Sequence, residues 1–156
     1  MKRLLLIVAL VSVACGGSWK ANLVKADQTV EQLLATVDDA ERVLCFGTTD
    51  VTAIPAAQRG HCTAGTVGLT DTLHQQISKS LSHAYAAQIR LGPILKAAQS
   101  GAAVPSDLTA ALADAKDIQS LISAATPNAK IGAFLAQVTA WTSALAALMA
   151  QFGGTR

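Results

Sequence analysis

The sequence is poor in aromatic residues and has no run of β-branched residues. Phenylalanine, tyrosine and tryptophan make up only 4% of its 156 residues, whereas alanine and leucine are abundant. Strands are enriched in aromatic and β-branched residues, and alanine and leucine rank high in helix propensity. A sheet is therefore not expected, and we predict an all-α protein.

The motifs of several enzyme classes are also missing. The chain has no Gly-x-Ser-x-Gly nucleophile elbow, no phosphate-binding loop and no dinucleotide-binding fingerprint. None of the three histidines, His61, His74 and His83, belongs to a Glu-x-x-His pair, which argues against a di-iron carboxylate bundle. Asp71 and His74 could share a helix face, but two ligands do not make a metal site, so a solvated polar cluster is expected there. We expect no enzyme activity, no cofactor and no metal site.

Charge of one sign is not in large excess. The chain has twelve basic and ten acidic residues, and two of the basic ones, Lys2 and Arg3, lie at the very start. Without those two, ten basic residues (12 − 2) balance ten acidic ones. Nucleic-acid binding needs clustered basic residues, so no nucleic-acid partner is expected.

The first residues have the three parts of a secretory signal. The basic start is followed by an apolar run from Leu4 to Val11 and then by small residues. The run is too short to cross a bilayer, which takes about 20 apolar residues. We predict an exported precursor in which residues 1–14 are the signal peptide.

The end of this signal resembles the lipobox of bacterial lipoproteins. The residues are Ser12-Val13-Ala14-Cys15, and in that class signal peptidase II cuts just before a cysteine that becomes acylated. Ser12 stands where the class prefers leucine, which leaves cleavage by signal peptidase I as an alternative. The resemblance covers about the first 15 residues and implies lipidation of Cys15, hence a membrane anchor. Residues 15–19 would then be a short flexible linker between the lipid and the domain, called the leash below.

The resemblance also implies a location. In this class an aspartate directly after the cysteine retains the protein at the inner membrane, and this chain has Gly16 there. The expected location is the cell envelope: the outer membrane of a double-membraned host, or otherwise the outer face of the plasma membrane.

The other two cysteines, Cys45 and Cys62, are left as a pair if Cys15 is acylated. Disulfides persist in exported proteins, so a Cys45–Cys62 disulfide is expected, with two free thiols as the alternative. A zinc site built from His61 and Cys62 lacks further ligands at a recognised spacing.

Four amphipathic helices are predicted in the domain of residues 20–156, at about 20–45, 66–99, 106–125 and 127–152. Their apolar residues recur at alternating steps of three and four. In the first helix these are Leu23, Ala26, Val30, Leu33, Val37, Ala40 and Leu44. Two of the connections are very short, which favours an antiparallel four-helix bundle with a disulfide-stapled loop between the first two helices.

Local signals predict the helix ends. Gly47 should end the first helix, and Thr66 or Thr70 should cap the second. Gly92-Pro93 should kink or break the second helix. Ser106 and Thr126 are the expected N-caps of the third and fourth helices.

The distribution of charge predicts which helices are neighbours. Residues 20–45 are mainly acidic, whereas residues 66–99 are mainly basic. Opposite charge favours placing these two helices side by side, although both sets could simply be solvated, because surface ion pairs contribute little.

Residues 131–152 contain no charge and are long enough to span a bilayer. Their bulky members lie on one helix face, which favours a core helix, with Phe134, Val138, Trp141 and Leu145 buried. The favoured function is a non-enzymatic envelope lipoprotein whose bundle binds an unknown envelope protein or acts as a scaffold, with a homo-oligomer possible. The alternatives are a membrane-active or self-associating protein using helix 131–152, and a small-ligand carrier.

Overall fold

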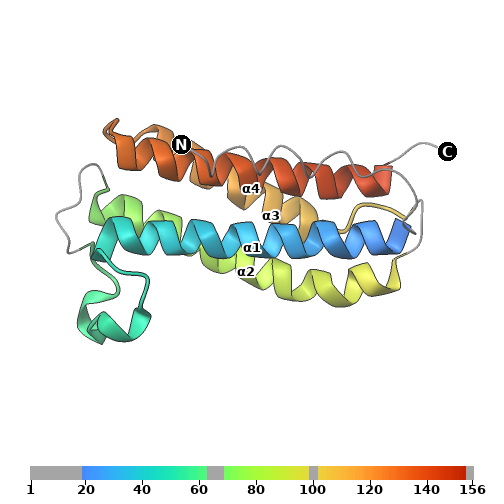
Figure 1. Cartoon of the computed structure of the whole chain (residues 1–156), viewed down its shortest axis with the longest axis horizontal. Coiled ribbons are helices and arrows are strands. Elements are labelled where there is room, and N and C mark those ends of the chain that lie inside the picture. The colour runs from blue at the N-terminus through green and yellow to red at the C-terminus, as the bar shows by residue number, and fades with distance from the viewer. Residues whose placement is uncertain (1–18, 63–68, 99–101, 154–156) are drawn as a thin grey trace, which may run out of the picture.

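The computed structural model describes residues 19–62, 69–98 and 102–153 (Figure 1). They form four long helices: α1 (Trp19–Phe46), α2 (Asp71–Ala97), α3 (Ser106–Ser123) and α4 (Ala129–Gly153). Two short 3-10 helices, η3 (Val51–Ala53) and η4 (Ala56–Gln58), lie between α1 and α2. No strand occurs in these ranges, and the all-α prediction is confirmed.

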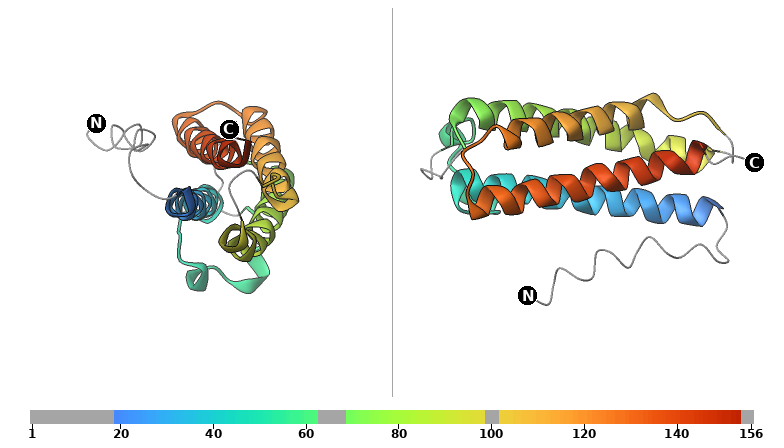
Figure 2. Two further views of the ribbon diagram at one scale, coloured as in Figure 1. Left: turned by 90° about the vertical axis from the view of Figure 1, so that its right-hand side faces the viewer. Right: turned by 90° about the horizontal axis from the view of Figure 1, so that it is seen from above.

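The four helices form an antiparallel bundle. Each helix packs against two others, in the ring order α1, α2, α3, α4, and consecutive helices run in opposite directions (Figures 1 and 2). The loop between α1 and α2 therefore lies at the opposite end of the bundle from the first residue of α1. This is the predicted architecture.

One apolar core fills the ring. It takes residues from the inward face of every helix, and its largest fully buried side chains include Trp141 and Phe134 of α4. The predicted buried face of α4 is confirmed, because Phe134, Val138, Trp141 and Leu145 are at most 1% exposed. By length and composition alone, α4 is the one helix in the described ranges that could cross a membrane, but here its bulky face packs against protein.

Trp19 belongs to this packing and not to the leash. It is the first residue of α1, and its indole Nε1 donates a hydrogen bond to the backbone oxygen of Gln151 at 3.0 Å. Its ring also meets Phe152 edge to face, with centroids 6.0 Å apart. The first turn of α1 is thus attached to the last turns of α4.

The ends of α1 and α2 follow their local signals. Gly47 ends α1 with a positive φ of 73°, a conformation that glycine adopts without steric cost. Thr70 is the N-cap of α2, and its side chain accepts a hydrogen bond from the backbone N–H of Leu73. Of the predicted kink or break at Gly92-Pro93, the break is wrong, because α2 continues through Pro93 to Ala97. Proline removes one backbone hydrogen bond, but Leu91 and Leu95 on either side are buried and keep this segment packed.

The predicted caps of α3 and α4 are also wrong. Ser106 is already the first helical residue of α3, and Pro105 occupies the N-cap position without a side-chain hydrogen bond. Thr126 lies before α4, whereas the Asn128 side-chain oxygen accepts hydrogen bonds from the N–H groups of Lys130 and Ile131, both at 3.0 Å. Asparagine is a strong N-cap residue, and its position starts α4 at Ala129.

The acidic helix and the basic helix are neighbours, but among the described residues no lysine or arginine of α2 pairs with an acidic residue of α1. Arg42 pairs within α1 with Asp38 and Asp39, and Arg90 of α2 pairs with Asp107 of α3 at 2.7 Å. Neutral groups of α2 contact the acidic residues of α1 instead: Gln88 Nε2 donates to Asp27 at 2.6 Å, and Tyr85 OH donates to Asp38 at 3.2 Å. Burial at this contact raises the pKa of Tyr85 to about 12.

Replacing Trp141 by alanine is expected to lower the free energy of unfolding by about 3–5 kcal/mol, because deleting a large buried aromatic leaves a cavity. Trp141→Phe should cost less, since it keeps a ring and removes an indole N–H that has no partner within the described residues. Urea unfolding followed by circular dichroism measures both. Ile89→Ala is the control, because Ile89 is 75% exposed; equal effects of Trp141→Ala and Ile89→Ala would contradict the core position of α4.

Candidate functional site: a buried glutamate and histidine beside a disulfide

The predicted disulfide joins Cys45, in the last turn of α1, to Cys62, in the loop between α1 and α2. The two Cα atoms are 4.5 Å apart, and Cys45 is fully buried. The prediction of a Cys45–Cys62 bond is confirmed, and the alternative of two free thiols is wrong for this structure. The bond closes the loop back onto the helix from which it leaves.

Further contacts within the loop hold its backbone. The Asp50 carboxylate caps η3 by accepting hydrogen bonds from the N–H and the hydroxyl of Thr52, at 2.8 and 2.6 Å, and these bonds lower the pKa of Asp50. The Arg59 guanidinium donates to the backbone oxygens of Ile54 and Val51, at 3.1 and 3.2 Å. The described part of the loop is therefore shaped by its own polar contacts as well as by the disulfide.

Asp71 attaches the loop to the start of α2. Its Oδ1 accepts a hydrogen bond from the backbone N–H of Cys62 at 2.7 Å, and its Oδ2 lies 3.3 Å from His61 Nδ1. Both side chains of the His61–Asp71 pair are more than half exposed. Asp71 thus contacts His61, whereas sequence reasoning considered it a partner of His74.

Beneath this surface pair lies a buried one. Glu41 of α1 and His74 of α2 are each only 3% exposed, and Glu41 Oε1 is hydrogen-bonded to His74 Nδ1. His74 Nε2 lies 3.4 Å from the backbone oxygen of Arg59, in the loop. The expectation of a solvated cluster around His74 is therefore wrong. The hydrogen bond to Glu41 raises the pKa of His74, although burial alone would lower it.

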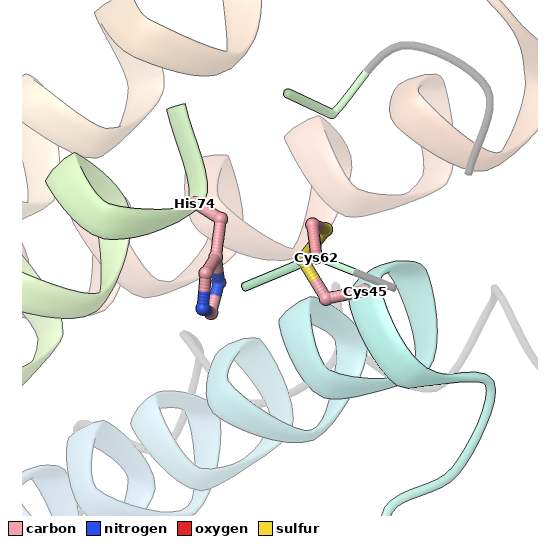
Figure 3. Close-up of side chains that lie close together, drawn as sticks. All are labelled: Cys45, Cys62 and His74. Carbon is pink, nitrogen blue, oxygen red and sulfur yellow. A yellow bond between two sulfur atoms is a disulfide. The ribbon is translucent and has the colours of Figure 1, made fainter. Parts of the chain in front are cut away.

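The disulfide and this buried pair form one cluster. Cys45 Sγ lies 3.5 Å from Glu41 Oε1, and the possible ligand atoms of Cys45, Cys62 and His74 all lie within 4.8 Å of one another (Figure 3). The ring of Phe46 meets His74 edge to face, with centroids 5.5 Å apart. The last turn of α1, the loop at Cys62 and the first turn of α2 therefore pack against one another in this cluster.

The chemistry of this cluster depends on the state of the sulfurs. A cysteine next to a histidine that is oriented by a carboxylate is the arrangement that activates a thiolate nucleophile. Here both sulfurs are bonded to each other, so neither is a nucleophile. In this form the cluster is a covalent and hydrogen-bonded joint between α1, the loop and α2.

The remaining histidine and the surface hollows do not form a second site of this kind. His83 of α2 lies 3.9 Å from Asp114 of α3, and its side chain is 62% exposed. The two best-formed hollows in the described ranges lie on this α2–α3 face and are shallow, with several polar or charged lining residues, including Lys79, Arg90 and Asp114. They are open to solvent and lack the enclosed character of small-molecule sites.

Sequence reasoning missed Glu41, although its spacing is informative. The buried residues of α1 include Val30, Leu34, Val37, Glu41 and Leu44, so Glu41 occupies a core position in the three-four rhythm. The predicted stripe used Leu33 and Ala40 in place of Leu34 and Glu41. His74 likewise continues the buried stripe of α2, three residues before Ile77.

Cys15, the predicted lipidation site, lies outside the described residues, as do the signal peptide and all of the predicted leash except Trp19. No protein-family model, no curated protein and no solved structure matches this chain.

A double-mutant cycle tests the buried pair. Glu41→Leu and His74→Leu should each lower the free energy of unfolding by about 3–5 kcal/mol, because each leaves one buried polar partner without the other. The double variant should be more stable than either single variant, since apolar residues then face each other. Urea unfolding with the disulfide intact measures this.

His61→Leu, at the exposed pair, is the matched control and should change the free energy of unfolding little. If the two single costs simply add in the double variant, Glu41 and His74 do not act as a pair.

Proposed function

We propose that the mature protein is a non-enzymatic, lipid-anchored protein of the bacterial cell envelope, which binds a partner or acts as a scaffold through its helical bundle. The observation that carries this proposal is the lipobox-like Ser12-Val13-Ala14-Cys15 close before a packed helix. Only Gly16, Gly17 and Ser18 separate Cys15 from the first residue of α1. A lipid on Cys15 would hold the bundle directly at the membrane surface.

The position of α1 gives the anchored bundle two different ends. The Trp19 end also contains the last turns of α2 and α4, whereas the loop between α1 and α2 lies at the other end (Figure 1). With 28 residues and a rise of about 1.5 Å per residue, α1 is about 42 Å long. If the bundle stands upright on the membrane, the loop lies at its membrane-distal end.

Several features support the loop as the surface that faces a partner. It is held by the disulfide, the Asp50 cap and the Arg59 hydrogen bonds, so little conformational entropy would be lost when it binds, which favours affinity. Its Val51 side chain is 40% exposed. Binding, rather than catalysis, fits a loop whose nearest reactive groups are a disulfide and a buried glutamate–histidine pair.

The two alternative functions have less support. The bulky face of α4 packs inside the bundle, so a membrane-active role would require this core to open. The hollows on α2 and α3 are open to solvent, whereas a small-molecule site usually encloses most of its ligand.

Cys15→Ala is expected to move the protein from the membrane fraction to the soluble fraction, or to leave an uncut precursor, because the acylated residue is lost. Membrane fractionation and immunoblotting in a bacterial host measure this outcome. Globomycin, which blocks signal peptidase II, should make the precursor of the parent protein accumulate. A variant that is still processed and membrane-bound like the parent would contradict the anchor.

A photo-crosslinking amino acid at position 51 is expected to capture an envelope protein in cells, because the loop end is the proposed binding surface. The same probe at position 89, on the side of α2, is the matched control, since Ile89 is more exposed than Val51. Immunoblotting for shifted bands measures the result. Adducts from position 89 but none from position 51 would place the binding surface on the side of the bundle.

A further inference from the structure

The buried cluster contains the donor set of a metal site in a latent form. Cysteine thiolates and histidine nitrogens are the preferred ligands of Zn²⁺, with Zn–S distances of about 2.3 Å and Zn–N distances of about 2.0–2.1 Å. Donor atoms around a tetrahedral zinc ion are therefore about 3.5–3.8 Å apart. The possible ligand atoms of Cys45, Cys62 and His74 already lie within 4.8 Å of one another, so only small movements separate them from this geometry.

We propose that reduction of the Cys45–Cys62 disulfide converts the cluster into a zinc site with Cys45, Cys62 and His74 as its protein ligands and water in the fourth position. A dithiol reductant would supply two electrons and two protons, becoming a disulfide itself while Cys45 and Cys62 become thiols. Zn²⁺ would then displace one proton from each thiol. In the disulfide form the sulfurs share a bond and the site does not exist.

Glu41 is the positioning residue of this site. Histidines that bind metals usually engage a carboxylate or a backbone carbonyl through their second nitrogen, which fixes the ring and raises its basicity. His74 has both kinds of neighbour, Glu41 Oε1 at Nδ1 and the Arg59 oxygen, 3.4 Å away, at Nε2. Zn²⁺ would bind Nε2 in place of the Arg59 contact, and Nδ1 would keep its hydrogen bond to Glu41. A disulfide needs no polar neighbours, so a metal site gives the buried Glu41–His74 pair a role that the disulfide alone does not.

The three ligands come from three segments of the fold. Cys45 and His74 lie on α1 and α2, which pack side by side, whereas Cys62 lies in the loop between these helices. The movement needed to separate the sulfurs and admit an ion would fall on the Cys62 side. The bound metal would then join the same segments as the disulfide and would add α2 to the crosslink.

The test uses the full chain with Cys15→Ala, in mild detergent, so that only Cys45 and Cys62 are thiols. After reduction with a thiol-free phosphine under anaerobic conditions, the protein is titrated with Co²⁺ and then Zn²⁺. We expect one equivalent of Co²⁺ to give a thiolate charge-transfer band and strong visible bands of tetrahedral cobalt, and Zn²⁺ to abolish them. The oxidised protein should show neither, and reduced protein without these bands would overturn the proposal.

Matched variants distinguish the ligands. His74→Gln should weaken binding at least about tenfold and change the cobalt spectrum, and Glu41→Gln should weaken it about tenfold, as is typical of outer-shell partners. His61→Gln and His83→Gln, at exposed histidines, should leave the affinity unchanged. Unchanged affinity in His74→Gln, or lost binding in His61→Gln, would overturn the ligand assignment.

A second measurement covers the case in which His74→Gln does not fold. In the reduced chain with native histidines, one equivalent of Zn²⁺ should slow the alkylation of both Cys45 and Cys62 by iodoacetamide at least about tenfold, measured by peptide mass spectrometry. Equal alkylation rates with and without Zn²⁺ would overturn the proposal. Neither readout depends on the membrane anchor, so the zinc site can fail while the proposed function stands, and the reverse.

Discussion

The structure depends on the burial of four apolar helix faces in one core, and α4 contributes the largest side chains to it. Trp141 and Phe134 are at most 1% exposed, and burial of apolar surface contributes roughly 25 cal/mol per Å². The positions of the charged and polar side chains have to be compatible with this packing. Most charged residues therefore lie on the outside of the ring, and the buried Glu41 and His74 lie at one end of it, where the loop covers them.

The helices and the disulfide could be predicted because each depends on a local or pairwise signal. The three-four rhythm of apolar residues indicates a helix wherever it occurs, and Cys45 and Cys62 have only each other if Cys15 is acylated. The helix starts of α3 and α4 were harder, since Ser106 and Thr126 are good caps that compete with Pro105 and Asn128 nearby. At α4 the N-cap preferences of Thr126 and Asn128 differ little. At α3 the preference favours Ser106, yet Pro105 occupies the N-cap position.

The candidate site could not be predicted, because it depends on tertiary contacts between residues that are distant in sequence. A glutamate at a core position of α1 can be recognised as part of a site only when a histidine at a core position of α2 faces it. That histidine lies 33 residues further along the chain. The charge pattern predicted the correct neighbours but not the ion pairs: Arg90 lies on the basic helix but pairs with Asp107 of α3. Ion pairs at a surface follow packing and do not direct it, because each contributes little.

If Cys15 carries the proposed lipid, the contact between Trp19 and the end of α4 has a mechanical consequence. A force on a lipid at Cys15 would reach the bundle at the first turn of α1, where peeling could begin one contact at a time. The Trp19 hydrogen bond to Gln151 and its edge-to-face contact with Phe152 hold the first turn of α1 against the end of α4. The force would then act along the length of α1 and shear it against α2 and α4. Under shear, many contacts resist the force at the same time.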